Sequence, residues 1–255
     1  MSIVACYKIV PDEQDIAINP DRTLNFSRAT LKIGDYDLNA VEAGAQLAAS
    51  TDTQLVSLTA GGPEVKDSKI KKSILSRGPA ENVAICDPVL ATAEADVISK
   101  ILAAAIRTMD EVNLVLCGEG SADLYEQQVG IQLGERLGWP AINAVSSLEV
   151  EGDRARLRRT LGNEVQVLEV TLPAVVSVVA DMNEPRIPSM KDILGAGKKP
   201  SKTLTPDEVG ITDLDGCLEI VSTLAPEQKE RACEILEGDD TDTITSFVAR
   251  IREME

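Results

Sequence analysis

The sequence contains no histidine among its 255 residues. This absence excludes Ser-His-Asp and Cys-His catalytic arrangements, metal sites that use histidine ligands, and the side chain that most often acts as general base near neutral pH. The five cysteines are odd in number and widely spaced, so we expect neither a disulfide framework nor a zinc or iron–sulfur site. Cys6, Cys86 and Cys117 lie in predicted strands, where cysteine typically acts as a small buried hydrophobic residue.

Aromatic residues and positive charge are also scarce. With one tryptophan, three tyrosines and two phenylalanines, the core must be built from aliphatic side chains. The 25 lysines and arginines face 42 acidic residues, and the net charge of −17 argues against nucleic acid or an anionic membrane as partner. Lys8 interrupts the first apolar run, and the longest later run, residues 172–180, is far too short to cross a bilayer. We therefore expect no signal peptide and a cytoplasmic protein.

The acidic charge is concentrated near the C-terminus. Residues 201–255 carry 14 acidic and 5 basic side chains, a net charge of −9. Helices are predicted over 226–236 and 241–254, but both contain too few apolar residues to build a core of their own. We expect an α/β domain over residues 1–199, followed by an acidic arm over 200–255 that packs on a partner chain.

Predicted strands and helices alternate along the first 180 residues. Strands are predicted over 2–10, 54–60, 83–86, 113–117 and 173–179, and helices over 38–50, 64–76, 91–109 and 127–137. Three further strands, over 144–150, 154–161 and 165–172, predict a meander that joins the sheet, and the polar connection 11–32 can form a hairpin around 19–21. This order predicts a mainly parallel, doubly wound sheet of the adenine-nucleotide-binding type, with helices on both faces.

The loop over residues 118–126 is rich in glycine, serine and aspartate and joins a buried strand to a helix. Val129, Leu133 and Leu137 recur at four-residue spacing and mark the face of that helix that packs on the sheet. Such a loop points main-chain N–H groups and the positive end of the helix dipole at an anion, and its glycines allow close approach. We expect this loop to hold the phosphates of an adenine nucleotide or a flavin dinucleotide.

Other interpretations of these segments remain open. The sequence Gly118-Glu119-Gly120-Ser121 is neither a G-x-G-x-x-G nor a Walker A motif, so an ordinary turn is an equal interpretation. Arg77-Gly78 could bind a phosphate, but a helix end with a favourable basic residue explains it better. The basic segment around Arg186 and Lys191, within the polar loop 181–199, is either a solvated loop or a docking site for an acidic partner.

Several stretches match one known family. They are ACYKIVPDEQDIAIN, DYDLNAVEAGAQL, LTAGGP, LSRGP, GEGSADLYEQQVGIQLGERLGWP and LPAVVSVVADMNEPRIPSMKDILGAGKKP. Along nearly its whole length the chain resembles the β subunit of electron-transfer flavoproteins. The resemblance is closest to the branch found beside acyl-CoA or carnitinyl-CoA dehydrogenase genes. Residues 162–169 have fewer acids than the family signature, while the LPAVVS that follows is intact.

The resemblance implies a nucleotide site and a docking loop. Such β subunits pair with an α subunit that carries FAD, and they bind AMP in ordinary members and a second FAD in electron-bifurcating members. By position, the nucleotide would contact Cys6, Lys8, Asp37, Gly61, Asp123, Gln127, Gln128, Val129 and Gly130. Residues 183–199 would form the recognition loop, with Met190 as the apolar anchor inserted into a dehydrogenase and Pro188 and Ile193 beside it. The arm would embrace the α subunit.

The activity implied is electron transfer, without hydrolase or group-transfer chemistry. In the bifurcating form, FAD in this subunit accepts hydride from NADH. One electron then goes to ferredoxin or flavodoxin, and the other passes through the α-subunit FAD to an acyl-CoA dehydrogenase or enoyl-CoA reductase. Two alternatives remain: a non-bifurcating carrier with structural AMP, and an adenine-nucleotide-binding module of the universal-stress type.

Overall fold

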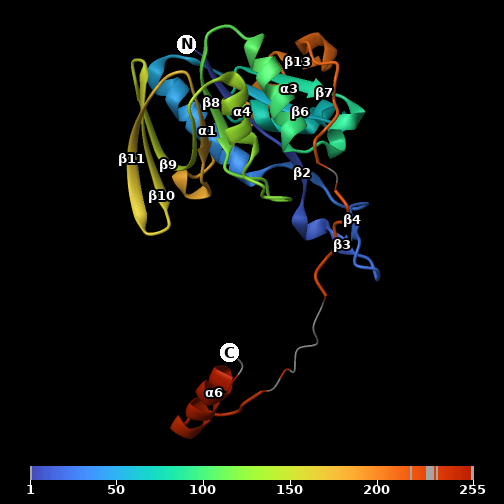
Figure 1. The fold of residues 1–255 in the computed structure, drawn as a ribbon, viewed down its shortest axis with the longest axis vertical. Coiled ribbons are helices and arrows are strands. Elements are labelled where there is room, and N and C mark those ends of the chain that lie inside the picture. Colours follow the sequence, from blue (N-terminus) through green and yellow to red (C-terminus); the bar gives the residue numbers. More distant parts are fainter. Residues whose placement is uncertain (1, 219, 228–232, 234, 254–255) are drawn as a thin grey trace. The chain divides into compact units, whose positions relative to one another are not determined.

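The computed structural model describes residues 2–218, 220–227, 233 and 235–253 (Figure 1). Contacts divide the chain into two units, one of residues 1–17 with 25–222 and one of residues 18–24 with 223–255. We call them the sheet unit and the terminal unit and describe each by itself. Among the helices in the described ranges, none is both long and apolar enough to cross a lipid bilayer.

The sheet unit is built on nine strands in the order β11-β10-β9-β12-β8-β1-β6-β7-β13. They are β1 (Ser2–Cys6), β6 (Gln54–Gly61), β7 (Glu81–Cys86), β8 (Val112–Gly118), β9 (Ala141–Glu151), β10 (Arg154–Leu161), β11 (Glu164–Thr171), β12 (Ala174–Val178) and β13 (Ser201–Leu204). Neighbours from β9 to β13 pair in parallel, and β10 and β11 add antiparallel pairs at one edge (Figure 1). The prediction of a mainly parallel sheet with a meander is confirmed.

Helices cover both faces of this sheet. They are α1 (Asp35–Thr51), α2 (Ser68–Leu75), α3 (Ala95–Arg107), α4 (Val129–Leu137) and the short α5 (Met190–Ala196). Side chains alternate along β1: Ile3 and Ala5 belong to the core beneath α1 and α2, whereas Val4 and Cys6 belong to the core beneath α3 and α4. The sheet is therefore doubly wound, and its central strand is buried on both faces, as its unbroken apolar sequence indicates.

Two further sheets contain two strands each. They are β2 (Ile9–Pro11) with β5 (Leu31–Ile33), and β3 (Ala17–Ile18) with β4 (Leu24–Asn25). The second pair encloses residues 19–21, so the hairpin predicted there is present.

Some element boundaries differ from the prediction. The helix predicted over 64–76 is divided at Asp67, whose side chain accepts hydrogen bonds from the main-chain N–H groups of Lys69 and Ile70 and so begins α2. A 3₁₀ turn, Pro63–Lys66, precedes it. The helix predicted from residue 91 begins at Ala95, after a second 3₁₀ turn, Pro88–Thr92. In each case a proline near the first turn starts a short helix that does not continue into the longer one.

The strand β13 was not predicted. Its four residues pair with β7 in parallel and extend the main sheet beyond residue 200. The stretch Ser-Lys-Thr-Leu is too short and too polar to show strand periodicity, and it is half-exposed as an edge strand.

The terminal unit contains α6 (Thr241–Glu253), as predicted for all but residue 254, which lies outside the described residues. Asp240 begins this helix by accepting hydrogen bonds from the N–H groups of Asp242 and Thr243. Its apolar side chains are partly exposed and recur at helical spacing: Ile244, Phe247, Val248 and Ile251. Most of the helix predicted over 226–236 falls outside the described residues.

Candidate functional site

The order in which the chain adds strands to the sheet reverses at β1. From β1 the chain builds β6 and β7 on one side, and it then returns through α3 to place β8 on the other side. Such a reversal leaves a crevice outside the carboxyl ends of the two strands, where open α/β sheets bind their ligands. The candidate site therefore lies where β1 ends at Cys6 and β8 ends at Gly118.

A buried carboxylate from α1 joins the ends of these two strands. Asp37 accepts a hydrogen bond from the main-chain N–H of Lys8 at 2.7 Å through Oδ2, and from that of Gly118 at 3.2 Å through Oδ1. Burial has the largest influence on this group and raises the pKa of Asp37 to about 7, against the two hydrogen bonds that favour its charged form. Asp37 thus fixes the spacing of the crevice walls and has no oxygen left without a donor.

Close approach explains the two glycines of the loop. A Cβ atom on Gly118 would lie 2.7 Å from Oδ1 of Asp37, so any larger residue would break the carboxylate bridge. A Cβ atom on Gly120 would lie 2.5 Å from the ring of Tyr125, which folds back over the loop. Tyr125 donates a hydrogen bond to Glu119, and its ring lies 5.3 Å from that of Tyr36. The sequence analysis missed this pair of aromatic rings beside the loop.

Lys8 reaches from the end of β1 to the loop after β8. Its ammonium group lies 2.7 Å from Oδ2 of Asp123, and the two side chains are 44% and 24% exposed. Burial works to raise the pKa of Asp123, but the hydrogen bonds from Lys8, Ser121 and the main-chain N–H of Leu124, together with the charge of Lys8, outweigh it and hold the pKa below its usual value. This pair brings together two of the residues that the sequence analysis placed at the nucleotide.

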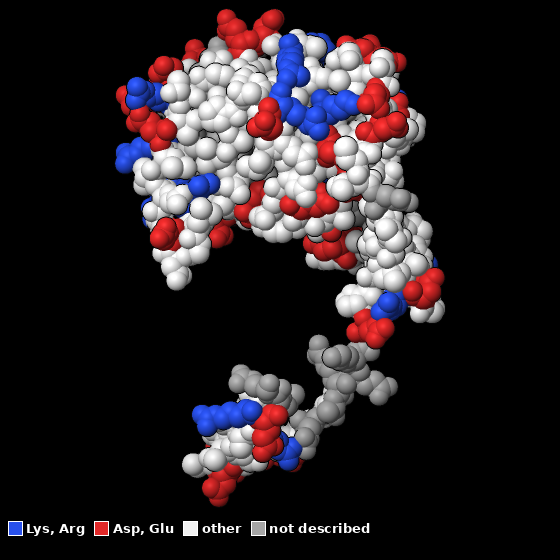
Figure 2. Space-filling view, in the orientation of Figure 1, with Lys and Arg blue, Asp and Glu red and all other residues white. Residues whose placement is uncertain are grey.

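Acidic side chains surround this one lysine. Burial, and then the neighbouring carboxylate of Glu126, raise the pKa of Glu94, and Lys8 acts on the same group in the opposite direction. Figure 2 shows acidic side chains in several separate groups over the visible face of the sheet unit, with fewer basic side chains among them. An anion at this rim would therefore be held by main-chain N–H groups and the dipole of α4, with Lys8 as the nearest cation.

The loop reaches α4 through a constrained backbone. Tyr125 and Gln127 adopt left-handed conformations, with φ of 50° and 59°, which non-glycine residues avoid unless their surroundings impose them. Gln128 precedes α4, and its side chain caps none of the main-chain N–H groups described there. Gly130 packs so closely on β12 that a Cβ atom would lie 2.1 Å from Oγ of Ser177. The first N–H groups of α4, from Val129 onward, are thus held beside the crevice.

Two of the predicted site residues, Cys6 and Gly61, present no side chain to the crevice. The side chain of Cys6 is buried in the core beneath α3 and α4, and a hydrogen bond with Cys117, followed by burial, raises its pKa well above the usual value. Gly61 ends β6 at the same edge of the sheet, but its turn is occupied by Glu64, which accepts the N–H of Gly62 at 2.6 Å. Cys6 and Gly61 could therefore offer a ligand their main chain only.

Arg77 confirms its interpretation as a helix-end residue. Its Nη1 atom donates to the carbonyl oxygen of Ser73 at 2.8 Å and to Oγ of the same residue at 2.8 Å. The guanidinium thus stabilises the last carbonyl groups of α2.

The residues that border the crevice are suited to binding a ligand. The thiol of Cys6 is held protonated, and the carboxylate of Asp37 is bound to two main-chain donors, so neither is placed as a nucleophile or base. Within the described ranges, no three side chains of the histidine, cysteine or acidic type gather as a metal site requires. The arrangement suits a cofactor that brings its own reactivity.

The predicted docking segment contains a short helix. Residues 183–189 form neither helix nor strand, and α5 follows over Met190–Ala196, where the sequence analysis expected a polar loop. Ser189 and Asp192 form a reciprocal capping box that starts α5, and Ala196 is buried at its end. Met190 is 74% exposed and Ile193 43% exposed, while Leu194, which was not predicted, is 72% exposed.

Comparison with protein families agrees with this architecture. A family model described as the electron transfer flavoprotein domain matches residues 23–209. The matched stretch contains Asp37, the loop after β8, α4 and the segment that carries α5.

Proposed function

The chain belongs to the electron transfer flavoprotein family, and we propose that it is the β subunit of such a protein, with FAD bound in the crevice between β1 and β8. When bound there, FAD supplies the capacity to take hydride from NADH and release single electrons. The complex with the α subunit would send one electron to ferredoxin or flavodoxin. It would send the other, through the α-subunit FAD, to an acyl-CoA dehydrogenase or enoyl-CoA reductase.

The observation that carries this proposal is the reversal point of the sheet, where the neighbouring strands β1 and β8 end side by side. The loop that borders it keeps its course only because Gly118 and Gly120 lack side chains, which would otherwise meet Asp37 and the ring of Tyr125. The N–H groups from Val129 and Gly130 at the start of α4 would hold the diphosphate, and the Lys8 ammonium would add a charge-assisted hydrogen bond. Asp123 would orient Lys8.

The remaining predicted residues would border the nucleotide less directly. In this proposal Gln127 and Gln128 present amide groups at the mouth of the crevice, whereas Cys6 and Gly61 contribute main-chain atoms. Asp37 would support the site without contacting the nucleotide through its carboxylate, because both carboxylate oxygens already accept hydrogen bonds from the main chain of Lys8 and Gly118.

We assign two protein contacts within the same proposal. The segment 183–199 would dock the dehydrogenase through Met190, with Pro188 and Ile193 beside it. The part of the predicted arm beyond the sheet unit, residues 223–255, would pack on the α subunit, and the partly exposed apolar side chains of α6 support this role.

Cofactor content tests the proposal directly. The chain is purified with its α subunit, and the released flavin and adenine nucleotide are quantified per heterodimer. Two FAD per heterodimer are expected, together with NADH-dependent reduction of ferredoxin or flavodoxin that requires an acyl-CoA acceptor. A heterodimer with one FAD and one AMP would refute the bifurcating function. A preparation free of flavin and nucleotide would refute the site itself.

The second candidate is a non-bifurcating carrier with structural AMP. The carboxylates of Asp123, Glu94 and Glu126 around Lys8 favour it, because a single phosphate requires less positive charge than a dinucleotide. The family assignment supersedes the alternative of a universal-stress-type module.

A further inference from the structure

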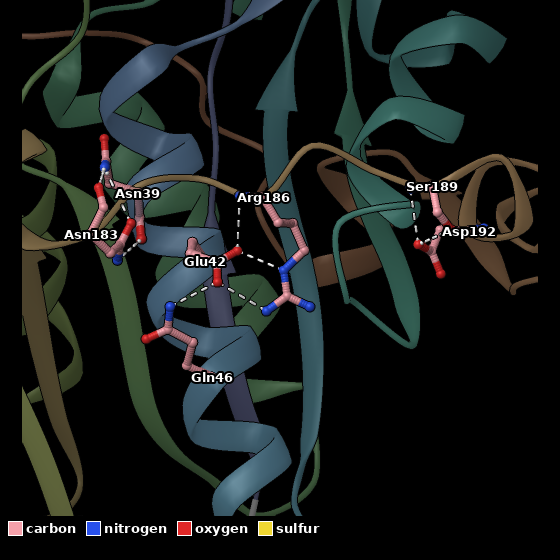
Figure 3. Close-up of polar contacts among 7 residues, drawn as sticks. All are labelled: Asn39, Glu42, Gln46, Asn183, Arg186, Ser189 and Asp192. Carbon is pink, nitrogen blue, oxygen red and sulfur yellow. Dashed lines mark hydrogen bonds and ion pairs between the residues drawn. The ribbon is translucent and has the colours of Figure 1, made fainter.

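The segment with the docking residues is fastened to α1 where it begins (Figure 3). The side-chain amide of Asn39 donates to the carbonyl oxygen of Asn183 at 2.7 Å and to that of Ala180 at 2.9 Å. Asn183 returns a hydrogen bond from its own amide to the carbonyl oxygen of Asn39 at 3.0 Å. With a further bond from the Asn39 amide to Oδ1 of Asn183 at 3.2 Å, four hydrogen bonds between one helical residue and one short stretch fix the direction in which the segment leaves the sheet.

One turn further along α1, a single carboxylate holds Arg186 (Figure 3). Oε2 of Glu42 accepts from Nε of Arg186 at 2.6 Å and from its main-chain N–H at 3.2 Å, and Oε1 accepts from Nη2 at 3.0 Å. Gln46 adds a fourth hydrogen bond at 2.8 Å. The planar guanidinium and the carboxylate meet along two parallel bonds, a geometry that restricts orientation as well as distance.

The environment keeps Glu42 charged. Its side chain is 7% exposed, whereas that of Arg186 is 41% exposed. Burial works to raise the pKa of Glu42, but the hydrogen bonds from Arg186 and Gln46 outweigh it and hold the pKa below its usual value. The pair is therefore intact throughout the neutral range.

The other end of the segment is fastened to α2. Ala196 is buried, and the Lys199 ammonium donates to the carbonyl oxygens of Leu75 at 2.7 Å and Pro79 at 2.6 Å. Between the two ends, the capping box of Ser189 and Asp192 preforms the first turn of α5.

Large apolar side chains between these ends are left in solvent. Ile187 is 94% exposed, and Met190 and Leu194, one helical turn apart on α5, are 74% and 72% exposed. The segment therefore has little apolar burial of its own to hold it in place. Its position depends on the polar contacts at its two ends.

We propose that Glu42 and Arg186 are positioning residues for partner docking, which hold Ile187, Met190 and Leu194 in place before an acyl-CoA dehydrogenase arrives. This inference rests on the docking role proposed above and adds to it a buried residue of α1. A segment ordered in advance loses less conformational entropy on binding, so its affinity for an apolar pocket is higher.

The test uses the complete heterodimer with the substitution Glu42→Gln, which keeps the size of the side chain but removes its charge. Electron transfer to an acyl-CoA dehydrogenase is measured over a range of heterodimer concentrations. The apparent KM for the heterodimer is expected to rise about tenfold, with kcat and bound nucleotide unchanged. Limited trypsin digestion after Arg186 and Lys191 is expected to become faster.

Two further variants give the test its controls. Arg186→Lys keeps the positive charge but loses the two-bond geometry, so it should raise KM in the same direction. Glu169→Gln removes an exposed ion pair between β11 and Arg154 of β10, which lie at one edge of the main sheet, and should change neither KM nor cleavage.

Several results would overturn the proposal. An unchanged KM in Glu42→Gln would show that docking is indifferent to the pair, and unchanged cleavage would show that the pair does not hold the segment. Loss of bound nucleotide would assign Glu42 a general structural role. Absence of electron transfer in the unmodified heterodimer would overturn the proposed function and this inference together.

Discussion

Two buried carboxylates on the same helix hold two different regions of the molecule. Asp37 fixes the crevice between β1 and β8 through main-chain N–H groups, and Glu42 fixes the docking segment through a guanidinium. Their pKa values move in opposite directions: burial raises that of Asp37 to about 7, while the hydrogen bonds from Arg186 hold that of Glu42 below its usual value. The helix α1 thus supports both regions with a carboxyl group, whose pKa is raised at Asp37 and lowered at Glu42.

The two pKa values differ because the two carboxylates have different hydrogen-bond donors. Main-chain N–H groups carry only partial charge, so they offset little of what it costs to bury the Asp37 carboxylate. A guanidinium carries a full charge and reaches solvent, so the Glu42 pair keeps its ionic character. The crevice is consequently held through the backbone, whereas the docking segment is held by polar contacts at its two ends, among them the Glu42–Arg186 ion pair.

Alanine substitutions should separate the two regions most clearly. Asp37→Ala leaves the N–H groups of Lys8 and Gly118 without their acceptor, and we expect a loss of about 3 kcal/mol in the free energy of unfolding. Glu42→Ala releases a half-exposed arginine to water, and we expect a loss of about 1 kcal/mol. Chemical denaturation of the two heterodimers checks the difference. Equal losses would contradict the contrast between main-chain and side-chain partners.

A change at the apolar docking residues should affect binding and leave the crevice intact. Met190→Ser removes the side chain that is proposed to enter the dehydrogenase, so we expect the affinity to fall by about thirtyfold, or about 2 kcal/mol. Flavin content and the melting temperature should not change, because Met190 is largely solvated. Loss of flavin from this variant would show that the segment 183–199 belongs to the nucleotide site.

The raised pKa of Asp37 predicts a pH dependence of stability. Because its folded pKa of about 7 lies above the usual 3.8, the folded chain binds a proton that the unfolded chain has lost. Its stability contribution is therefore full below the usual pKa and declines as pH rises through 7, by about 1.4 kcal/mol between pH 6 and pH 8. Denaturation at both values checks this. Asp37→Asn should remove this dependence, while Glu42→Gln should leave it in place.

The loop after β8 could be predicted from the sequence, but the contacts that hold it in place could not. Alternating strands and helices predicted the parallel sheet, and a glycine-rich loop before a helix predicted an anion cradle after β8. The role of Asp37 was not visible, because its contact with Gly118 joins residues 81 positions apart. The rings of Tyr36 and Tyr125 were missed for the same reason, since neither forms a local pattern.

The docking segment shows the same limit. Glu42 and Arg186 are 144 positions apart, and no periodicity in either stretch indicates their contact. The helix α5 carried a local signal in Ser189 and Asp192, the spacing of a capping box, but two flanking prolines and two glycines favoured a loop. Local chemistry therefore predicted the strand, loop and helix of the candidate nucleotide site, and tertiary contacts determined how each region is held.

The capping box of Ser189 and Asp192 gives a small expected effect. It tests whether the docking segment and the crevice are stabilised independently. In Ser189→Ala the N–H of Asp192 loses its acceptor and Asp192 loses the hydroxyl, so the start of α5 should be destabilised by about 1 kcal/mol. Hydrogen exchange should become faster at residues 190–193 and remain unchanged at the end of β8, because the two regions share α1 but no contact with Ser189. Faster exchange at Gly118 in this variant would show that the crevice and the docking segment behave as one cooperative unit.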